Sequence, residues 1–315
     1  MQKITVNSLK LLALITVLIV VAVGCGGGGG TSGKVDLSGA NLTVGSKEFT
    51  EQLILGQMSI LVLENAGATV KDQTRLAGSV AVRKALTSGQ IDMYWDYTGT
   101  GWIVYLGHTK PIDDSYKQYK AVDKEDSKKN GIEWLPPAPA NNTYALAVRS
   151  EAADKLGVTK LSDLKQLVQE QPDQATVCAA SEFLSRDDGL PGLEKAYGFE
   201  FPKENISELA EGPIYQAIDQ GDKCNFGEVF ATDGRMANLG LKVLEDDKNF
   251  FPIYNPSLCV NKKVLEEYPQ IEKIFAPINE KLTTEELQKL NEKVDVKGQL
   301  EDQVAEEWLK ENGFI

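Results

Sequence analysis

The feature that most constrains the fold of this chain is an alternation of short strand-like runs with helix-like segments, which occurs twice. The first copy predicts, in order, 42–47 (strand), 50–66 (helix), 69–76 (strand), 79–88 (helix) and 91–95 (strand). The second copy predicts 175–180 (strand), 190–197 (helix), 206–209 (strand), 214–220 (helix) and 226–230 (strand). Strands that alternate with helices favour parallel α/β sheets. The pattern therefore predicts an α/β protein with two βαβ lobes.

Local signals support these elements. Ile54, Met58 and Leu61 recur at helical spacing in the first helix. Ser79 is predicted to cap the N-terminus of the second helix, and Gly89 is predicted to end it.

Two segments are predicted to link the lobes and to form a two-segment hinge: residues 142–148 lead into the second lobe, and residues 251–260 lead back. The predicted lobes are 41–141 plus 255–315 (first) and 142–254 (second). The tail after residue 263 is charged and helical, with helices at 282–292 and 300–312, and we expect it to pack on the first lobe. Two α/β lobes imply a cleft, and ligands of open α/β sheets bind beyond the carboxyl ends of strands.

The N-terminal segment resembles a bacterial lipoprotein signal. Lys3 and Lys10 precede an apolar run at 11–23, which is shorter than the roughly 20 residues of a membrane span. Small residues then precede Cys25. The resemblance implies cleavage before Cys25 and lipidation of its thiol, although an ordinary signal peptide or a signal anchor stays open.

This interpretation divides the N-terminus into a signal peptide, residues 1–24, and a lipid anchor with a glycine-rich linker, residues 25–40. Five consecutive glycines, 26–30, have no reason to fold and suit a flexible spacer. We therefore expect an extracytoplasmic protein, lipid-anchored to the bacterial cell membrane.

Composition excludes several classes of function. The formal net charge is −13 and the chain has no basic run, which argues against a nucleic-acid partner. His108 is the only histidine, so histidine-based triads and multi-histidine metal sites are nearly excluded. No G-x-S-x-G motif is present either. We expect no catalytic residues, no metal and no cofactor.

Three cysteines remain if Cys25 is acylated, and none forms a C-x-x-C pair. An exported protein of this kind has room for one disulfide. Cys178 with Cys224 is the preferred pair because both fall in or beside predicted strands of the second lobe, which leaves Cys259. Buried free thiols remain an equal alternative.

Several segments together with the lipid-attachment signature resemble one family. They are Val44–Glu51 (VGSKEFTE), Gly89–Thr100 (GQIDMYWDYTGT) and Ala231–Arg235 (ATDGR). The family is the substrate-binding lipoproteins of ABC importers for glycine betaine, choline and related quaternary amines. The resemblance implies a type II-like periplasmic-binding-protein fold that closes on its ligand.

The resemblance also implies an aromatic cage. A trimethylammonium group has no N–H to donate, and aromatic faces attract it by about 0.5–2 kcal/mol each. Tyr97, Tyr144 and Tyr215 match cage positions of the family. A fourth family tyrosine is absent after the ATDGR segment, so the cage is three-walled or is completed by Phe230 or Trp95.

The ligand carboxylate is assigned by the same resemblance. Lys47, Thr100 and Arg186 match carboxylate-binding positions, and Asn142 matches a polar position beside the cage. Lys47 with Arg186 favours a carboxylate-bearing ligand over choline, and a carboxylate that bridges them would stabilise the closed state.

The predicted function is therefore capture of glycine betaine or a related quaternary-ammonium osmolyte for an ABC importer. The expected partners are the ligand, the permease with its ATPase, and the membrane through the lipid anchor, with the protein acting as a monomer. Choline or another betaine, including thiol-imidazole betaines, is the near alternative. A secreted enzyme on the same bilobed scaffold and a structural surface lipoprotein are the others.

Overall fold

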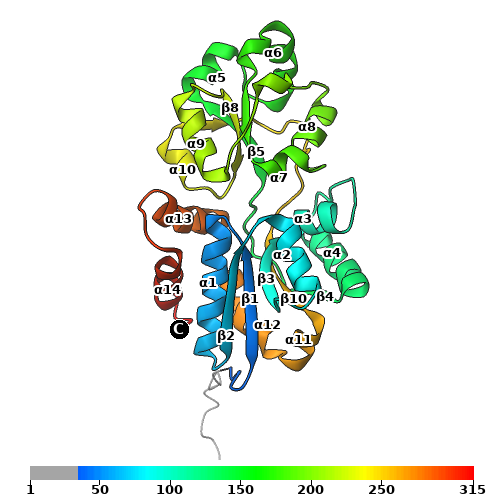
Figure 1. The fold of residues 1–315 in the computed structure, drawn as a ribbon, viewed down its shortest axis with the longest axis vertical. Helices are drawn as coiled ribbons and strands as arrows, with labels where there is room; N and C mark the ends of the chain where they lie inside the picture. The colour runs from blue at the N-terminus through cyan, green and yellow to red at the C-terminus, as the bar shows by residue number, and fades with distance from the viewer. Residues whose placement is uncertain (1–34) are drawn as a thin grey trace, which may run out of the picture. The chain divides into compact units, whose positions relative to one another are not determined.

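The computed structural model describes residues 35–315, and its first five-stranded sheet has the order β2-β1-β3-β10-β4 (Figure 1). Its strands are β1 (Asn41–Lys47), β2 (Thr69–Leu76), β3 (Met93–Tyr97), β4 (Ile132–Trp134) and β10 (Pro256–Asn261). β1 runs parallel to β2 and β3, whereas β10 is antiparallel to both β3 and β4. We call this sheet with its helices the first lobe.

The second sheet has the order β7-β6-β8-β5-β9. Its strands are β5 (Tyr144–Arg149), β6 (Val177–Ala179), β7 (Ile206–Glu208), β8 (Phe226–Phe230) and β9 (Leu241–Val243). β6 is parallel to β7 and β8, and β5 is antiparallel to β8 and β9. The two sheets therefore correspond strand for strand, as a duplicated α/β layout predicts. We call this sheet with its helices the second lobe.

The helices of the first lobe are α1 (Thr50–Asn65), α2 (Gly78–Thr87), α3 (Thr98–Thr100), α4 (Ser115–Asn130), α11 (Lys262–Glu267), α12 (Gln270–Asn279), α13 (Thr284–Asp295) and α14 (Glu301–Glu311). Those of the second are α5 (Ser150–Leu156), α6 (Leu164–Glu170), α7 (Ser181–Ser185), α8 (Leu190–Tyr197), α9 (Glu211–Gln220) and α10 (Arg235–Asn238). Helices α13 and α14 pack beside α1 in the first lobe, so the predicted packing of the tail is confirmed (Figure 1).

The largest hydrophobic core lies in the first lobe. Trp95 of β3 is 1% exposed in this core, with Phe275 of α12 edge-on to its ring. The indole N–H of Trp95 donates to the Ser59 hydroxyl of α1 at 2.8 Å. Trp95 is therefore a core residue and does not complete an aromatic cage.

Two chain segments cross between the sheets, residues 135–143 and 244–255. They are hydrogen-bonded to each other, because Asn142 N–H donates to the Tyr254 carbonyl (3.0 Å) and Tyr254 N–H donates to Asn141 Oδ1 (2.8 Å). The chain thus crosses twice, as predicted, but the predicted bounds of 142–148 and 251–260 are wrong, because most of the first range forms β5 and half of the second forms β10. Residues 35–315 form one compact unit.

Several predicted boundaries are wrong, and the two helices of the tail, for example, are Thr284–Asp295 and Glu301–Glu311. The third strand begins at Met93 and not at 91, and α9 begins at Glu211 because Pro213 is tolerated in a first helical turn. Ser79 is not the cap of α2. The helix begins one residue earlier, with Ala77 as its N-cap, and carboxylates of Glu48 and Glu182 accept the first backbone N–H groups.

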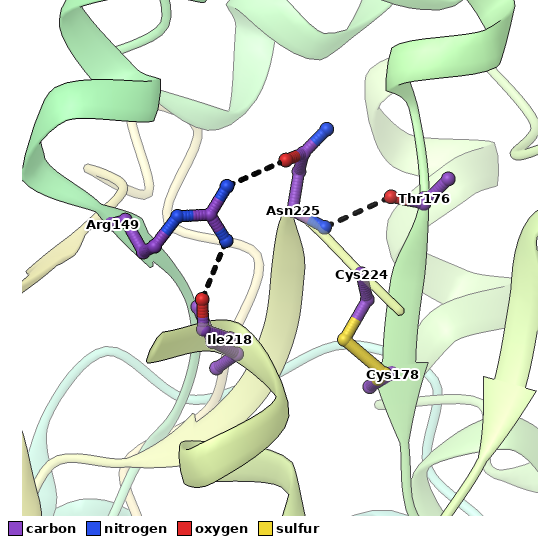
Figure 2. The surroundings of a disulfide bond; sticks show 6 residues. All are labelled: Arg149, Thr176, Cys178, Ile218, Cys224 and Asn225. Atoms are coloured by element: carbon purple, nitrogen blue, oxygen red, sulfur yellow. Dashed lines mark hydrogen bonds between the residues drawn. A yellow bond between two sulfur atoms is a disulfide. The ribbon is translucent and has the colours of Figure 1, made fainter. Parts of the chain in front are cut away.

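The second lobe contains the disulfide, which joins Cys178 of β6 to Cys224 just before β8 with a Cα–Cα distance of 5.8 Å (Figure 2). The preferred pairing is thus confirmed, and Cys259 is a buried free thiol in β10. Beside the disulfide, Arg149 donates to Asn225 Oδ1 (2.9 Å) and to the Ile218 carbonyl (2.6 Å). These bonds and the disulfide tie β5, β6, α9 and β8 together.

The predicted signal peptide, the lipidation site Cys25 and the glycine run lie outside the described residues. Within 35–315, no helix is both long and apolar enough to cross a membrane.

Candidate ligand-binding site

A cavity of about 1000 Å³ is lined by residues of both lobes. Its lining includes the last residues of three strands: Lys47 of β1, Tyr97 of β3 and Phe230 of β8. The first turns of α2 and α9 also contribute. This is the place where open α/β sheets bind ligands, beyond the carboxyl ends of their strands.

All but one of the ligand contacts expected from the sequence line this cavity. They are Lys47, Tyr97, Thr100, Asn142, Tyr144, Arg186 and Phe230. The exception is Tyr215, which is 1% exposed and lies behind the lining. Its hydroxyl accepts the backbone N–H of Phe230 at 3.0 Å, and the Arg235 guanidinium lies 4.1 Å from its ring centroid.

Aromatic rings gather on one side of the cavity. Phe49 is stacked against Tyr97 (centroids 6.3 Å apart, 17° between planes) and against Phe230 (5.7 Å, 9°). Tyr144 lies 5.1 Å from Phe230 and meets Tyr254 edge-on at 5.4 Å. All five rings line the cavity. They offer apolar, electron-rich faces, the surface that suits a cation without N–H groups.

Sequence reasoning missed Phe49 and Tyr254. Phe49 follows β1 by two residues, and Tyr254 precedes β10 by two residues. Their positions in the sequence could have indicated them, because Phe49 lies just after a strand end and Tyr254 lies in the segment that returns to the first lobe. Gly99 accounts for part of the packing, because a Cβ there would lie 2.7 Å from the Tyr254 ring.

Glu51 brings a buried carboxylate to the aromatic side, where it is 3% exposed. It accepts hydrogen bonds from the Tyr97 hydroxyl (2.7 Å), Asn142 Nδ2 (3.0 Å) and Asn291 Nδ2 (3.1 Å). Burial raises the pKa of Glu51, and the hydrogen bonds oppose that rise. The amide of Asn142 is thus held by a glutamate at the edge of the rings.

Lys47 already has an internal partner. Its ammonium lies 2.9 Å from Asp96 Oδ1, and both side chains are almost fully buried. The same ammonium lies 5.2 Å from the Tyr97 ring centroid. Removal of one partner of such a buried ion pair would strongly destabilise the folded protein, because the other charge would stay buried without compensation.

Arg186 has partners at all three guanidinium nitrogens. Nε and Nη2 form a bidentate pair with Asp188 (2.7 and 2.5 Å), and Nη1 donates to Glu182 Oε1 at 2.6 Å. Nη2 also donates to Thr100 Oγ1 of the first lobe at 3.3 Å. The Tyr254 hydroxyl donates to Asp188 as well, at 2.7 Å. These hydrogen bonds to protein groups hold the guanidinium in position without a contribution from a ligand.

Three glutamates of the second lobe lie close together here with different charge states. For Glu182, burial opposes ionisation, but attraction by Lys47 and Arg186 and the bonds from Ser79 outweigh it and lower its pKa to about 2. For Glu211, burial and the nearby charges of Glu182 and Glu48 raise the pKa to about 8. Burial also raises the pKa of Glu228 well above its usual value. At neutral pH, Glu182 is therefore ionised and Glu211 is mostly protonated.

Among residues 35–315, no group of three or more histidine, cysteine or carboxylate side chains is placed to hold a metal ion. The cavity lining offers aromatic faces, carboxylates and the paired cations Lys47 and Arg186.

The chain matches known proteins over most of its length. Residues 40–311 match the family model described as the substrate binding domain of ABC-type glycine betaine transport systems. The chain is 38% identical to the glycine betaine-binding protein YehZ of Escherichia coli over 276 residues, which is 86% of this chain and 90% of the relative. It is also 38% identical to a glycine-betaine-binding protein of Pseudomonas aeruginosa, covering 87% of this chain and 88% of that one.

A solved structure agrees with the sequence comparison. Apo YehZ from Escherichia coli superposes with a TM-score of 0.64 at 36% identity, covering 87% of this chain and 99% of that one. The bilobed fold, the family model and the relatives lead to one conclusion. The chain belongs to the family of substrate-binding domains of ABC-type glycine betaine transport systems.

Proposed function

We propose that this protein captures glycine betaine or a related quaternary-ammonium osmolyte in an aromatic cage between its lobes. The observation that carries the proposal is the group of five rings, Phe49, Tyr97, Tyr144, Phe230 and Tyr254, on one side of a cavity that also holds the buried Glu51. A trimethylammonium group would contact the ring faces, and the Glu51 carboxylate, when ionised, would offset its charge.

Membership of this family gives the type of transporter that the chain serves. The chain is the substrate-binding protein of a betaine-, carnitine- or choline-type ABC importer, and it is not an enzyme. Members of this family are extracytoplasmic binding proteins. The permease of that importer, with its ATPase, is the partner that would receive the loaded form.

The other end of the ligand is proposed to meet Lys47, Thr100 and Arg186, with Asn142 beside the cage. Thr100 and Arg186 come from different lobes and already touch. A ligand that contacts both lobes would favour the closed state by its differential affinity for that state. Closure would then report ligand occupancy to the permease.

We also propose that the protein is lipid-anchored through Cys25 after removal of residues 1–24, and that it acts as a monomer. Support for the anchor comes from the apolar run and the small residues before Cys25. Cys25→Ala should move the protein from the membrane fraction to the soluble fraction. An unchanged distribution would contradict the anchor.

Calorimetric titration of residues 35–315 with glycine betaine tests the function. We expect one-to-one binding that Tyr144→Ala weakens by about 2- to 30-fold, since a ring face contributes roughly 0.5–2 kcal/mol. Tyr116→Ala is the matched control, because Tyr116 is 67% exposed on α4. No binding of glycine betaine, choline or carnitine by the folded protein would contradict the proposal.

A further inference from the structure

The cavity contains a position where a carboxylate can be bound between the two lobes. Ser79, in the first turn of the ten-residue helix α2, offers its backbone N–H and its hydroxyl to the cavity. Arg186 offers Nη1 from the second lobe, and Lys47 supplies positive charge nearby. A helix N-terminus with a guanidinium and an ammonium beside it forms a strong anion-binding position.

A side chain of the protein itself occupies that position. Glu182 of α7 accepts the Ser79 backbone N–H (3.0 Å) and hydroxyl (2.6 Å) across the lobes, and accepts Arg186 Nη1 at 2.6 Å. Attraction by Lys47 adds to these bonds and keeps the carboxylate ionised. Glu182 therefore occupies an anion-binding position that includes Arg186, one of the groups proposed to meet the ligand carboxylate.

We propose that Glu182 is a specificity-determining residue, which fills the anion-binding position of the cavity and shifts ligand preference away from quaternary amines that carry a carboxylate. The proposal rests on the proposed function and deepens it. A betaine must displace Glu182 or lie beside it, and two ionised carboxylates at one site repel each other. A ligand with the same trimethylammonium group and a neutral hydroxyl end avoids that repulsion.

The surrounding charges agree with this role. Arg186 is already neutralised by Asp188 as well as by Glu182, and Lys47 by Asp96. Glu48 also lines the cavity, and its carboxylate accepts the backbone N–H of Gly78 at 2.8 Å. The balance of charge thus disfavours a second anion and tolerates a net cation.

Choline and glycine betaine form the test pair, because they share the trimethylammonium group and differ in a hydroxyl against a carboxylate. Titrations of residues 35–315 would give the ratio of their dissociation constants in the wild type, Glu182→Ala and Glu182→Gln. We expect Glu182→Ala to shift the ratio towards glycine betaine by about tenfold or more. Glu182→Gln removes the charge and keeps the size, so it should shift the ratio in the same direction even if the alanine variant folds poorly.

Glu208→Ala is the matched control. Glu208 lines the same cavity from β7 and is exposed, so its removal changes the net charge equally without emptying the position beside Ser79. The control should leave the ratio within about twofold, as expected for an exposed charge. A ratio that is unchanged in both Glu182 variants, that moves towards choline, or that moves equally in Glu208→Ala would overturn the inference.

A different result would contradict the proposed function. If neither ligand binds the folded wild type or any variant, the cavity does not bind these amines and Glu182 has no such preference to set.

Discussion

The two lobes have matching strand orders but bring different chemistry to the cavity. The first lobe contributes two aromatic rings beside the strand ends, the buried carboxyl group of Glu51, and Lys47 bound to Asp96. The second lobe contributes the ionised Glu182 and the protonated Glu211. A duplicated scaffold therefore leaves its strand-end loops free to diverge, and the asymmetry of the ligand is met by the asymmetry of these loops.

The lobes also differ in how they are held together. The first has the larger core, which includes Trp95 and the C-terminal helices, whereas the second has the disulfide between Cys178 and Cys224. All four tryptophans, Trp95, Trp102, Trp134 and Trp308, belong to the first lobe. Tryptophan fluorescence therefore follows the unfolding of the first lobe and can distinguish it from the unfolding of the second.

The largest effect is expected for Trp95→Ala. Loss of a fully buried indole and its bond to Ser59 should cost about 3–5 kcal/mol in the free energy of unfolding. Urea unfolding followed by the fluorescence of the remaining tryptophans measures it. Tyr116→Ala, at an exposed site, is the control and should stay within about 0.5 kcal/mol of the wild type. A cost below about 1 kcal/mol for Trp95→Ala would contradict its core role.

Replacing both Cys178 and Cys224 by serine should destabilise the second lobe by about 2–4 kcal/mol, because the bond closes a loop with a sequence separation of 46. Far-UV circular dichroism should reveal a transition at lower urea than tryptophan fluorescence does. Addition of a reductant should alter the wild type and leave the double variant unchanged. Coincident, equally shifted transitions would show that the lobes unfold as one unit.

Stability should fall as the pH rises between about 4.5 and 8 because of Glu211. Its pKa is about 8 in the folded protein and near 4.5 when unfolded, so the folded state binds the extra proton in this window. The contribution is complete below pH 4.5 and is lost as pH rises through 8, with a slope of at most about 1.4 kcal/mol per pH unit.

Glu211→Gln should reduce that slope, as measured by thermal melts from pH 5 to 8, while the raised pKa of Glu228 maintains part of it. Glu208→Gln is the matched control, since it changes an exposed glutamate of the same cavity. Equal slopes in the wild type and Glu211→Gln would rule out the proposed proton on Glu211.

The smallest effect is expected for Tyr215→Phe. Loss of the hydroxyl that accepts the Phe230 N–H should cost about 1 kcal/mol of stability. Because Tyr215 lies behind the cavity lining, ligand affinity should change by less than about twofold. Scanning calorimetry measures the stability of this variant, and titration calorimetry measures its ligand affinity. A tenfold loss of affinity would indicate that the hydroxyl contacts the ligand.

Local sequence patterns predicted much of the fold but few of the side-chain contacts within the site. Alternating strands and helices identify both lobes, and Tyr97 and Phe230 could be expected at the cavity because each ends a strand. The contact between Ser79 and Glu182 spans 103 residues, and that between Glu51 and Asn291 spans 240. No periodicity encodes such contacts, because they depend on how two sheets meet.

The ion pairs that neutralise Lys47 and Arg186 were equally difficult to predict from the sequence. Lys47 and Arg186 were each expected to await a ligand carboxylate, yet Asp96 and Asp188 already pair with them. Asp188 is only two residues from Arg186, so that pair could have been suspected from the sequence. Asp96 lies 49 residues from Lys47 and meets it only because β1 and β3 are neighbours.

The position of β10 has a consequence for the order in which the chain folds. β10 separates β3 from β4 in the first sheet, yet it is synthesised after every strand of the second sheet. As the chain emerges, β5 to β9 are contiguous and complete their sheet while β3 and β4 still lack the strand between them. Closing the long connection to β10 is entropically costly and comes late. The first lobe, although it contains the N-terminal strands, is therefore the last to be completed, because it needs β10.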